Sequence, residues 1–160
     1  MRIGLATTDA ARGRDLDHRP LAAALEALGC VVDAPAWEDA TVDWSRYALV
    51  LPRSTWNYPD DLKAFLAWAS RVSAVTRFEN GPATLRYTTD KRYLLDLDRR
   101  GVPVVPSTVT VPGELWSPPA AGSYVVKPTV GADARGASRP AMRRRPGRMR
   151  RGWPSAASAC

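Results

Sequence analysis

The sequence predicts an α/β fold in which parallel strands alternate with helices. Short apolar runs at Ile3–Thr7 and Tyr47–Leu51 have the length and composition of buried strands. Two segments, 20–28 and 62–72, repeat their apolar residues with the period of an amphipathic helix. A hydrophobic content of 45% is that of a globular protein. The resulting order, βαββαβ, favours a small Rossmann-like layer with mostly parallel strands.

The first half of this layer begins almost at the N-terminus with the strand Ile3–Thr7. The helix that follows has Pro20 in its first turn, and Gly29 suits the position just after its end. Its apolar stripe consists of Leu21, Ala24, Leu25 and Leu28. Cys30–Val32 is the second predicted strand.

The second half contains the third strand, Tyr47–Leu51, and a helix that starts at Pro59. Two acidic residues, Asp60 and Asp61, lie at the positive end of this helix, where carboxylates are favourable. Its apolar stripe is formed by Leu62, Phe65, Leu66, Ala69 and Val72. Val75–Phe78 is a short fourth strand, and residues 79–82 are predicted to form a turn.

A polar and aromatic segment follows the third strand, at the edge where open α/β sheets bind ligands. Arg53, Thr55 and Asn57 are the candidate substrate contacts, between the large side chains of Trp56 and Tyr58. A cation for a carboxylate and aromatic walls suit a substrate crevice. Composition equally allows a loop whose aromatic residues complete the core, and both interpretations stay open.

After residue 85 the sequence changes character. Thr88 or Thr89 can cap a helix that begins at Asp90-Lys91 and ends at Gly101, and Val102–Pro106 is predicted as an edge strand because prolines interrupt it. Tyr124–Val126 is predicted as a strand that ends in Lys127 and opens into the loop Gly131–Gly136. Loop amides and a lysine can bind phosphate, although an ordinary turn is the simpler interpretation of the loop alone. A P-loop is rejected, since Ala137 stands at the lysine position.

The net charge of +7 belongs to the C-terminal tail. All 16 acidic residues lie at or before Asp133, whereas residues 138–160 hold seven arginines and no acid. This tail has no hydrophobic period, and we expect it to be disordered. A single histidine, His18, and two distant cysteines exclude histidine-clustered metal sites and a disulfide framework. With no signal peptide or membrane-length apolar run, a soluble cytoplasmic protein is expected.

Several of these segments, taken in order, resemble a known family. Thr89–Leu95, Gly101–Pro106, Tyr124–Pro128 and the glycine loop resemble the start of an ATP-grasp domain. Arg53–Tyr58 resembles the pre-ATP-grasp segment of glutathione-synthetase-like and cycloserine-biosynthesis-like members. The resemblance covers roughly residues 1–137. It implies a pre-ATP-grasp domain at 1–85, the start of the nucleotide-binding domain at 86–137 and a separate tail at 138–160.

ATP-grasp ligases use ATP and Mg²⁺ to phosphorylate a carboxylate, and an amine or thiol then displaces the acyl phosphate. The resemblance places Lys91 on the ATP phosphates and Lys127 near the α-phosphate and adenine. It makes the Gly131–Gly136 loop the flap over the β- and γ-phosphates, and it implies ATP and a small carboxylate as partners. From the residues alone, Lys91 and Lys127 are equally well interpreted as solvated surface lysines.

The family's late acidic Mg²⁺ ligands have no counterpart, because no acidic residue follows Asp133. We therefore expect an ATP-binding fragment of a ligase, inactive alone, whose tail is read out of frame after codon 137. Two alternatives remain. One is an arginine-tail binder of nucleic acid without sequence preference, and the other is a non-catalytic interaction module with exposed strand edges.

Overall fold

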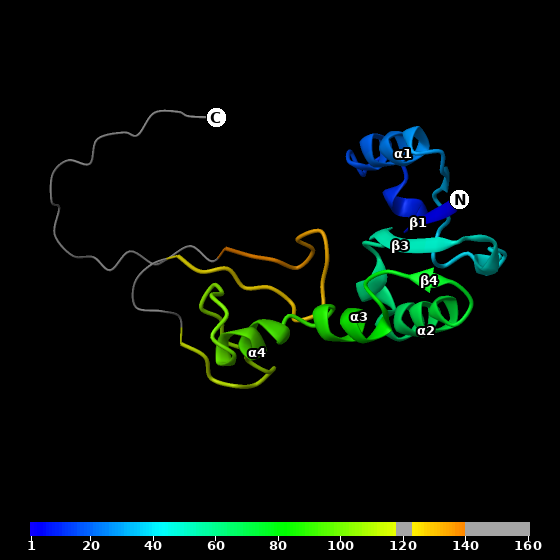
Figure 1. The fold of residues 1–160 in the computed structure, drawn as a ribbon. Helices are drawn as coiled ribbons and strands as arrows, with labels where there is room; N and C mark the ends of the chain where they lie inside the picture. The colour runs from blue at the N-terminus through cyan, green and yellow to red at the C-terminus, as the bar shows by residue number, and fades with distance from the viewer. Residues whose placement is uncertain (118–122, 140–160) are drawn as a thin grey trace, which may run out of the picture.

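The computed structural model describes residues 1–117 and 123–139. Its centre is a four-stranded parallel sheet with the strand order β2-β1-β3-β4 (Figure 1). The strands are β1 (Arg2–Thr7), β2 (Val31–Asp33), β3 (Leu49–Ser54) and β4 (Arg77–Phe78). The predicted α/β class and the parallel pairing of the strands are confirmed.

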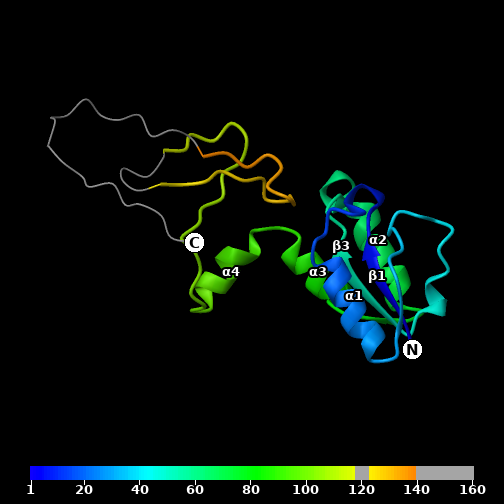
Figure 2. The same cartoon turned by 90° about the horizontal axis from the view of Figure 1, so that it is seen from above.

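Helices cover both faces of the sheet. α1 (His18–Ala27) lies on one face, and α2 (Leu62–Ser73) lies on the other, with α3 (Pro82–Thr88) packed against α2 (Figures 1 and 2). α4 (Tyr93–Arg99) follows outside this layer. Short 3-10 turns occur at Asp9–Ala11, Trp44–Arg46 and Tyr58–Asp60. Asp61 caps α2, because its carboxylate accepts a hydrogen bond from the Ala64 amide at 2.9 Å.

The hydrophobic core lies between the sheet and α2. The helical repeat of α2 brings Phe65, Trp68 and Val72 onto one face, and all three are at most 2% exposed. Trp68 stacks on Phe65 with ring centroids 5.4 Å apart. The same cluster includes Ala6, Trp37, Tyr47, Val50 and Ala69. Burial of these large rings provides most of the apolar contact of the layer.

The third strand extends beyond its predicted end. The sequence predicted that this strand ends at Leu51, whereas β3 continues through Pro52 to Ser54. The carbonyl of Val50 faces β4 and accepts from the Glu79 amide at 3.1 Å. Pro52, two residues later, faces the same edge at a point where β4 has already ended. Its missing N–H therefore costs no ladder hydrogen bond.

The predictions after residue 80 need more correction. The predicted turn at 79–82 runs directly into α3, and Pro82 occupies the first helical position. The next helix begins at Tyr93 rather than Asp90, because Asp90 forms a bridge with Val130. The Lys91 amide donates to the Thr129 carbonyl at 2.8 Å, which holds this segment against the glycine loop.

The two strands predicted in this region are not formed. Residues 102–106 have no ladder partner, and the segment Tyr124–Val126 has only one bridge, from Val126 to Ser138. A strand needs a continuous neighbour to satisfy its backbone groups, and neither segment has one among the described residues. The expected disorder of the tail falls almost entirely on residues outside the described ranges. Within those ranges, no helix has the length and apolar character needed to cross a membrane.

Candidate functional site

The strand order reverses between β1 and β3, so the carboxyl ends of these strands form a topological switch point. Polar side chains gather there in a nearly buried group. Thr7 and Thr8 follow β1, and Ser54 and Thr55 lie at the end of β3; their exposed fractions are 6%, 2%, 2% and 7%. The predicted substrate residue Thr55 thus lies at this edge, but it is largely covered.

The guanidinium of Arg53 faces carboxylates of the same chain. Its Nη2 lies 3.0 Å from Asp17 Oδ2, and its Nε lies 3.6 Å from Asp15 Oδ2. Ser54 donates its hydroxyl to Asp15, and this hydrogen bond is the main reason why the pKa of Asp15 is lowered. Burial opposes that shift, while Arg53 assists it. The loop before α1 therefore occupies the predicted carboxylate clamp.

Asn57 holds the aromatic core in place. Its Oδ1 accepts from Trp37 Nε1 at 2.6 Å, and its Nδ2 donates to Glu38 Oε1 at 3.2 Å. The two neighbouring aromatic residues, Tyr58 and Trp56, have different packing partners. Tyr58 packs on Phe65 at 5.5 Å, whereas Trp56 lies under the Arg14 guanidinium at 5.8 Å. Tyr58 thus completes the core, as one interpretation of this segment expected, whereas the substrate contacts of Arg53, Thr55 and Asn57 stay a prediction.

The predicted nucleotide-binding residues come together at the glycine loop. Lys91 Nζ donates to the carbonyl oxygen of Gly131 at 2.8 Å and to that of Thr129 at 3.4 Å. Burial lowers the pKa of Lys91, and the charge of nearby Lys127 lowers it further. Neither lysine forms an ion pair within the described parts of the chain. Two cations therefore lie close together, and the charge of Asp90 offsets part of the lowering of the Lys91 pKa.

The loop between Gly131 and Gly136 is tightly turned. Asp133, Ala134 and Gly136 have φ values of 51°, 55° and 70°. A Cβ added to Gly136 would lie 2.9 Å from Pro128 Cγ, so this position requires glycine for two reasons. Gly131, by contrast, does not have a positive φ. A Cβ added to Gly131 would have Lys91 Nζ as its nearest neighbour, at 3.5 Å.

Three contacts that the sequence did not suggest hold the loop against the sheet layer. The Tyr58 hydroxyl donates to the Gly131 carbonyl at 3.1 Å, and burial raises the pKa of Tyr58. Arg135 forms a two-pronged pair with Asp60, at 2.7 and 3.1 Å. Arg14 reaches Asp133 at 3.1 Å. These partners are separated by 73 to 119 residues, so no local pattern could have revealed them.

The described residues offer no ready magnesium centre. Nowhere in ranges 1–117 and 123–139 do three or more side chains of the metal-binding types gather closely enough to hold an ion. The one carboxylate of the glycine loop, Asp133, is paired with Arg14, and the remaining groups around Lys91 are a second lysine and backbone groups, which suit an anion rather than a cation.

Comparison with known proteins points to one enzyme. Residues 3–80 match the family model for the N-terminal domain of D-cycloserine synthetase DcsG. The cycloserine biosynthesis protein DcsG of Streptomyces lavendulae is 43% identical over 126 residues, covering 73% of this chain and 42% of that protein. The crystal structure of D-cycloserine synthetase DcsG superimposes with a TM-score of 0.78 at 38% identity, covering 87% of this chain and 50% of that one.

These matches support the part of the sequence resemblance that pointed to cycloserine-biosynthesis proteins. Membership of the ATP-grasp superfamily stays a prediction, as do the domain division and the roles of the site residues. The chain spans less than half the length of its curated relative and half that of the solved structure. Over the length that it shares with them, the chain is similar in sequence and fold to D-cycloserine synthetase DcsG, and at residues 3–80 to the N-terminal domain of that enzyme.

Proposed function

We propose that this chain provides the ATP-binding part of a carboxylate ligase that works through an acyl phosphate. The observation that carries the proposal is the meeting of Lys91 and Lys127 at the Gly131–Gly136 loop. The similarity to a cycloserine synthetase supports a ligase-like biosynthetic role.

The electrostatics of this cluster favour a phosphate. Lys91 Nζ is bound only to neutral carbonyl oxygens, and its pKa is lowered by burial and by Lys127. An anion placed between the two amines would remove their repulsion and replace weak dipole contacts with charge-assisted hydrogen bonds. A triphosphate supplies several such oxygens at once, which suits two cations and a turned loop.

In the proposed reaction a carboxylate oxygen attacks the γ-phosphorus of ATP, and the bond to the bridging oxygen breaks to release ADP. An amine or thiol then attacks the acyl carbon and expels inorganic phosphate. The two lysines would neutralise the phosphate charge and orient the γ-phosphoryl group. The described residues do not fit a magnesium ion, so no step is assigned to one, and we expect ATP binding without sustained turnover from this chain alone.

The carboxylate substrate would approach the carboxyl ends of β1 and β3. Arg53 remains our candidate for its carboxylate, with Thr55 and Asn57 beside it. Arg53 is bound to Asp17, whose side chain is 81% exposed. Because exposed ion pairs contribute little, a substrate carboxylate can replace Asp17 at small cost.

Calorimetric titration with ATP tests the proposal. Wild type is compared with Lys91→Ala, Lys127→Ala and Lys63→Ala; Lys63 is the only other lysine and is exposed on α2. Lys91→Ala and Lys127→Ala should each weaken ATP binding by about tenfold or more, since hydrogen bonds to charged groups contribute about 1.5–3 kcal/mol. Lys63→Ala should bind like wild type. Absence of wild-type binding, or equal losses in all three variants, would contradict the assignment.

A further inference from the structure

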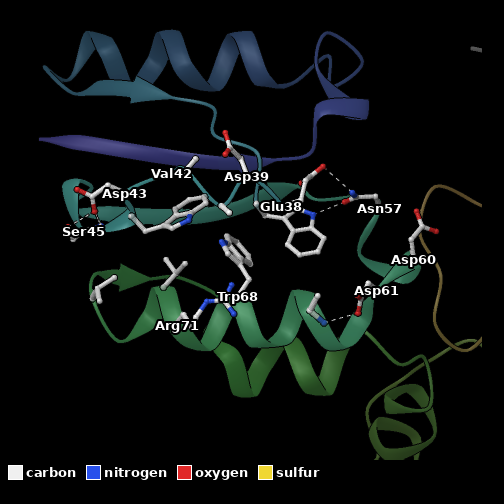
Figure 3. Close-up of a pocket in the computed structure, with 16 residues that line it drawn as sticks. Glu38, Asp39, Val42, Asp43, Ser45, Asn57, Asp60, Asp61, Trp68 and Arg71 are labelled. Atoms are coloured by element: carbon white, nitrogen blue, oxygen red, sulfur yellow. Dashed lines mark hydrogen bonds between the residues drawn. The ribbon is translucent and has the colours of Figure 1, made fainter.

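A cavity lies apart from the cluster formed by Lys91, Lys127 and the glycine loop. It has a volume of about 920 Å³ and runs between α2 and the connector from β2 to β3 (Figure 3). None of Lys91, Lys127 and the loop Gly131–Gly136 lines it. Its volume falls within the range of small-molecule sites, which span roughly 300–1,000 Å³. Of the residues that the ligase proposal uses, only Asn57 lines this cavity.

Tryptophans provide the apolar surface of the cavity. Trp44 meets Trp68 edge to face with ring centroids 5.3 Å apart, and Trp37 lies 6.0 Å from Trp68. The rest of the apolar lining consists of Ala40, Val42, Ala64, Val72 and Val75. Indole rings are the best aromatic partners for a cation, because their faces carry negative charge.

The charges around the cavity are mostly negative. Five carboxylates line it, against one guanidinium, that of Arg71. Asp43 accepts hydrogen bonds from the hydroxyl and amide of Ser45, which lower its pKa and keep it ionised. Asp43 has no ion-pair partner among the described residues and precedes Trp44 in the chain. Figure 3 shows Asp43 at one end of the cavity and Asp61 towards the other.

The indole N–H of Trp68 supplies an independent sign that this cavity takes a ligand. The residue is 2% exposed, and its Nε1 has no hydrogen-bond partner within the described ranges. Figure 3 shows the ring between α2 and the connector that carries Val42 and Asp43. Trp37 differs, since its own N–H donates to Asn57 at 2.6 Å. An unpaired buried donor is costly, and an acceptor on a bound molecule would remove that cost.

We propose that this cavity binds a small organic cation that also carries a hydrogen-bond acceptor, such as an amino amide or amino ester. Its ammonium group lies over Trp44 near Asp43. Its acceptor oxygen meets the Trp68 N–H after the indole turns toward the cavity, because that nitrogen is covered by protein atoms in the free chain. Its apolar body covers Trp44, Val42 and Val72. The inference is tested separately from the ligase proposal, because it relies on Asp43, Trp44 and Trp68, to which that proposal gives no role, and on a ligand of opposite charge.

Titration of the full chain with L-phenylalaninamide, followed through the indole N–H resonances, tests this site. The chain has six tryptophans, and Trp68→Phe identifies the Trp68 signal by its loss. We expect saturable displacement of that signal with a Kd on the order of 1 mM or tighter. N-acetyl-L-phenylalaninamide, which lacks the charge, should bind about tenfold more weakly or worse. Phenethylamine, which lacks the acceptor, should bind about fivefold more weakly.

Two variants separate binding from folding. Asp43→Asn preserves the acceptor for Ser45 while removing the charge, and it should weaken binding about threefold or more and reduce the salt dependence. Glu79→Gln removes a carboxylate that does not line the cavity, and it should leave the titration unchanged. The proposal fails if the Trp68 signal does not move up to about 20 mM ligand, a range well above the expected Kd. It also fails if the acetylated amide binds as well as the amine.

Discussion

The sheet layer at residues 1–80 and the segment at 86–139 are stabilised in different ways. Every buried hydrophobic residue among those described lies between Ile3 and Val72. In the second region, by contrast, Val105 is 79% exposed and Leu115 is fully exposed. Its glycine loop is held to the layer by three polar contacts: the bond from Tyr58 to Gly131 and the ion pairs Arg135–Asp60 and Arg14–Asp133. The first region is thus defined by packing, and the second depends on contacts that a ligand can exchange.

The largest expected effect comes from the core. Trp68→Ala should reduce the free energy of unfolding by about 3–5 kcal/mol, because it removes a ring buried against Phe65 and Trp44. Val105→Ala, in the exposed segment, should change it by no more than about 0.5 kcal/mol. Urea denaturation monitored by circular dichroism measures both. Comparable losses from the two substitutions would break the contrast between the regions.

A smaller effect is expected at the switch point. Asp15→Asn weakens the hydrogen bond from Ser54 and should cost about 1–2 kcal/mol at neutral pH, as for other hydrogen bonds to charged groups. Because the folded pKa of Asp15 is lowered from 3.8, its contribution is present above that value and is lost as the pH falls through the lowered folded pKa. Stability curves from pH 7 to pH 2 should therefore be less steep for the variant. Parallel curves for the wild type and the variant would show that protonation of Asp15 does not contribute to the pH dependence of stability.

The docking of the glycine loop provides a sharper probe of the second region. Tyr58→Phe removes the hydroxyl that donates to Gly131 but keeps the ring on Phe65. We expect loop opening to become easier by about 0.5–1.5 kcal/mol, with global stability nearly unchanged. Limited proteolysis near residues 131–137 and chemical denaturation report these two quantities separately. An equal loss in both would mean that loop and core unfold together.

The smallest expected effect is that of the ion pair between Arg135 and Asp60. Both side chains are more than half exposed, at 59% and 55%. Arg135→Ala should therefore weaken loop docking by less than about 1 kcal/mol, and the difference from wild type should fade in high salt. The same proteolysis assay at low and high salt measures it. A salt-independent loss would point to packing by the arginine stem instead.

The sequence revealed the layer because its signals are local. The apolar runs of β1 and β3 and the helical repeat of α2 each determine one element without help from distant residues. The α3 helix had a visible signal in Pro82, but Gly81 beside it suggested a turn instead. The strands expected at 102–106 and 124–126 depend on neighbours that a local pattern does not supply.

The site was only partly predictable for the same reason. Lys127 and the loop were selected from their own pattern and Lys91 through the resemblance, and the structure brings them together. Tyr58 was considered as an aromatic wall or as part of the core, and its bond to Gly131 was missed because it joins residues 73 positions apart. Asn57 was considered as a substrate contact, but its amide binds Trp37 and Glu38. Side-chain polarity alone does not distinguish a ligand contact from a bond within the core.

Hydrogen exchange with and without saturating ATP tests most directly whether the second region is organised by a ligand. We predict that ATP slows exchange at residues 127–137 in wild type but not in Lys91→Ala, while exchange in β1 and β3 changes little. That pattern would mean that the nucleotide orders the loop through Lys91 on a sheet layer that is already formed. If wild-type exchange at 127–137 is unchanged by ATP, or if Lys91→Ala responds equally, the lysine cluster is not a nucleotide site.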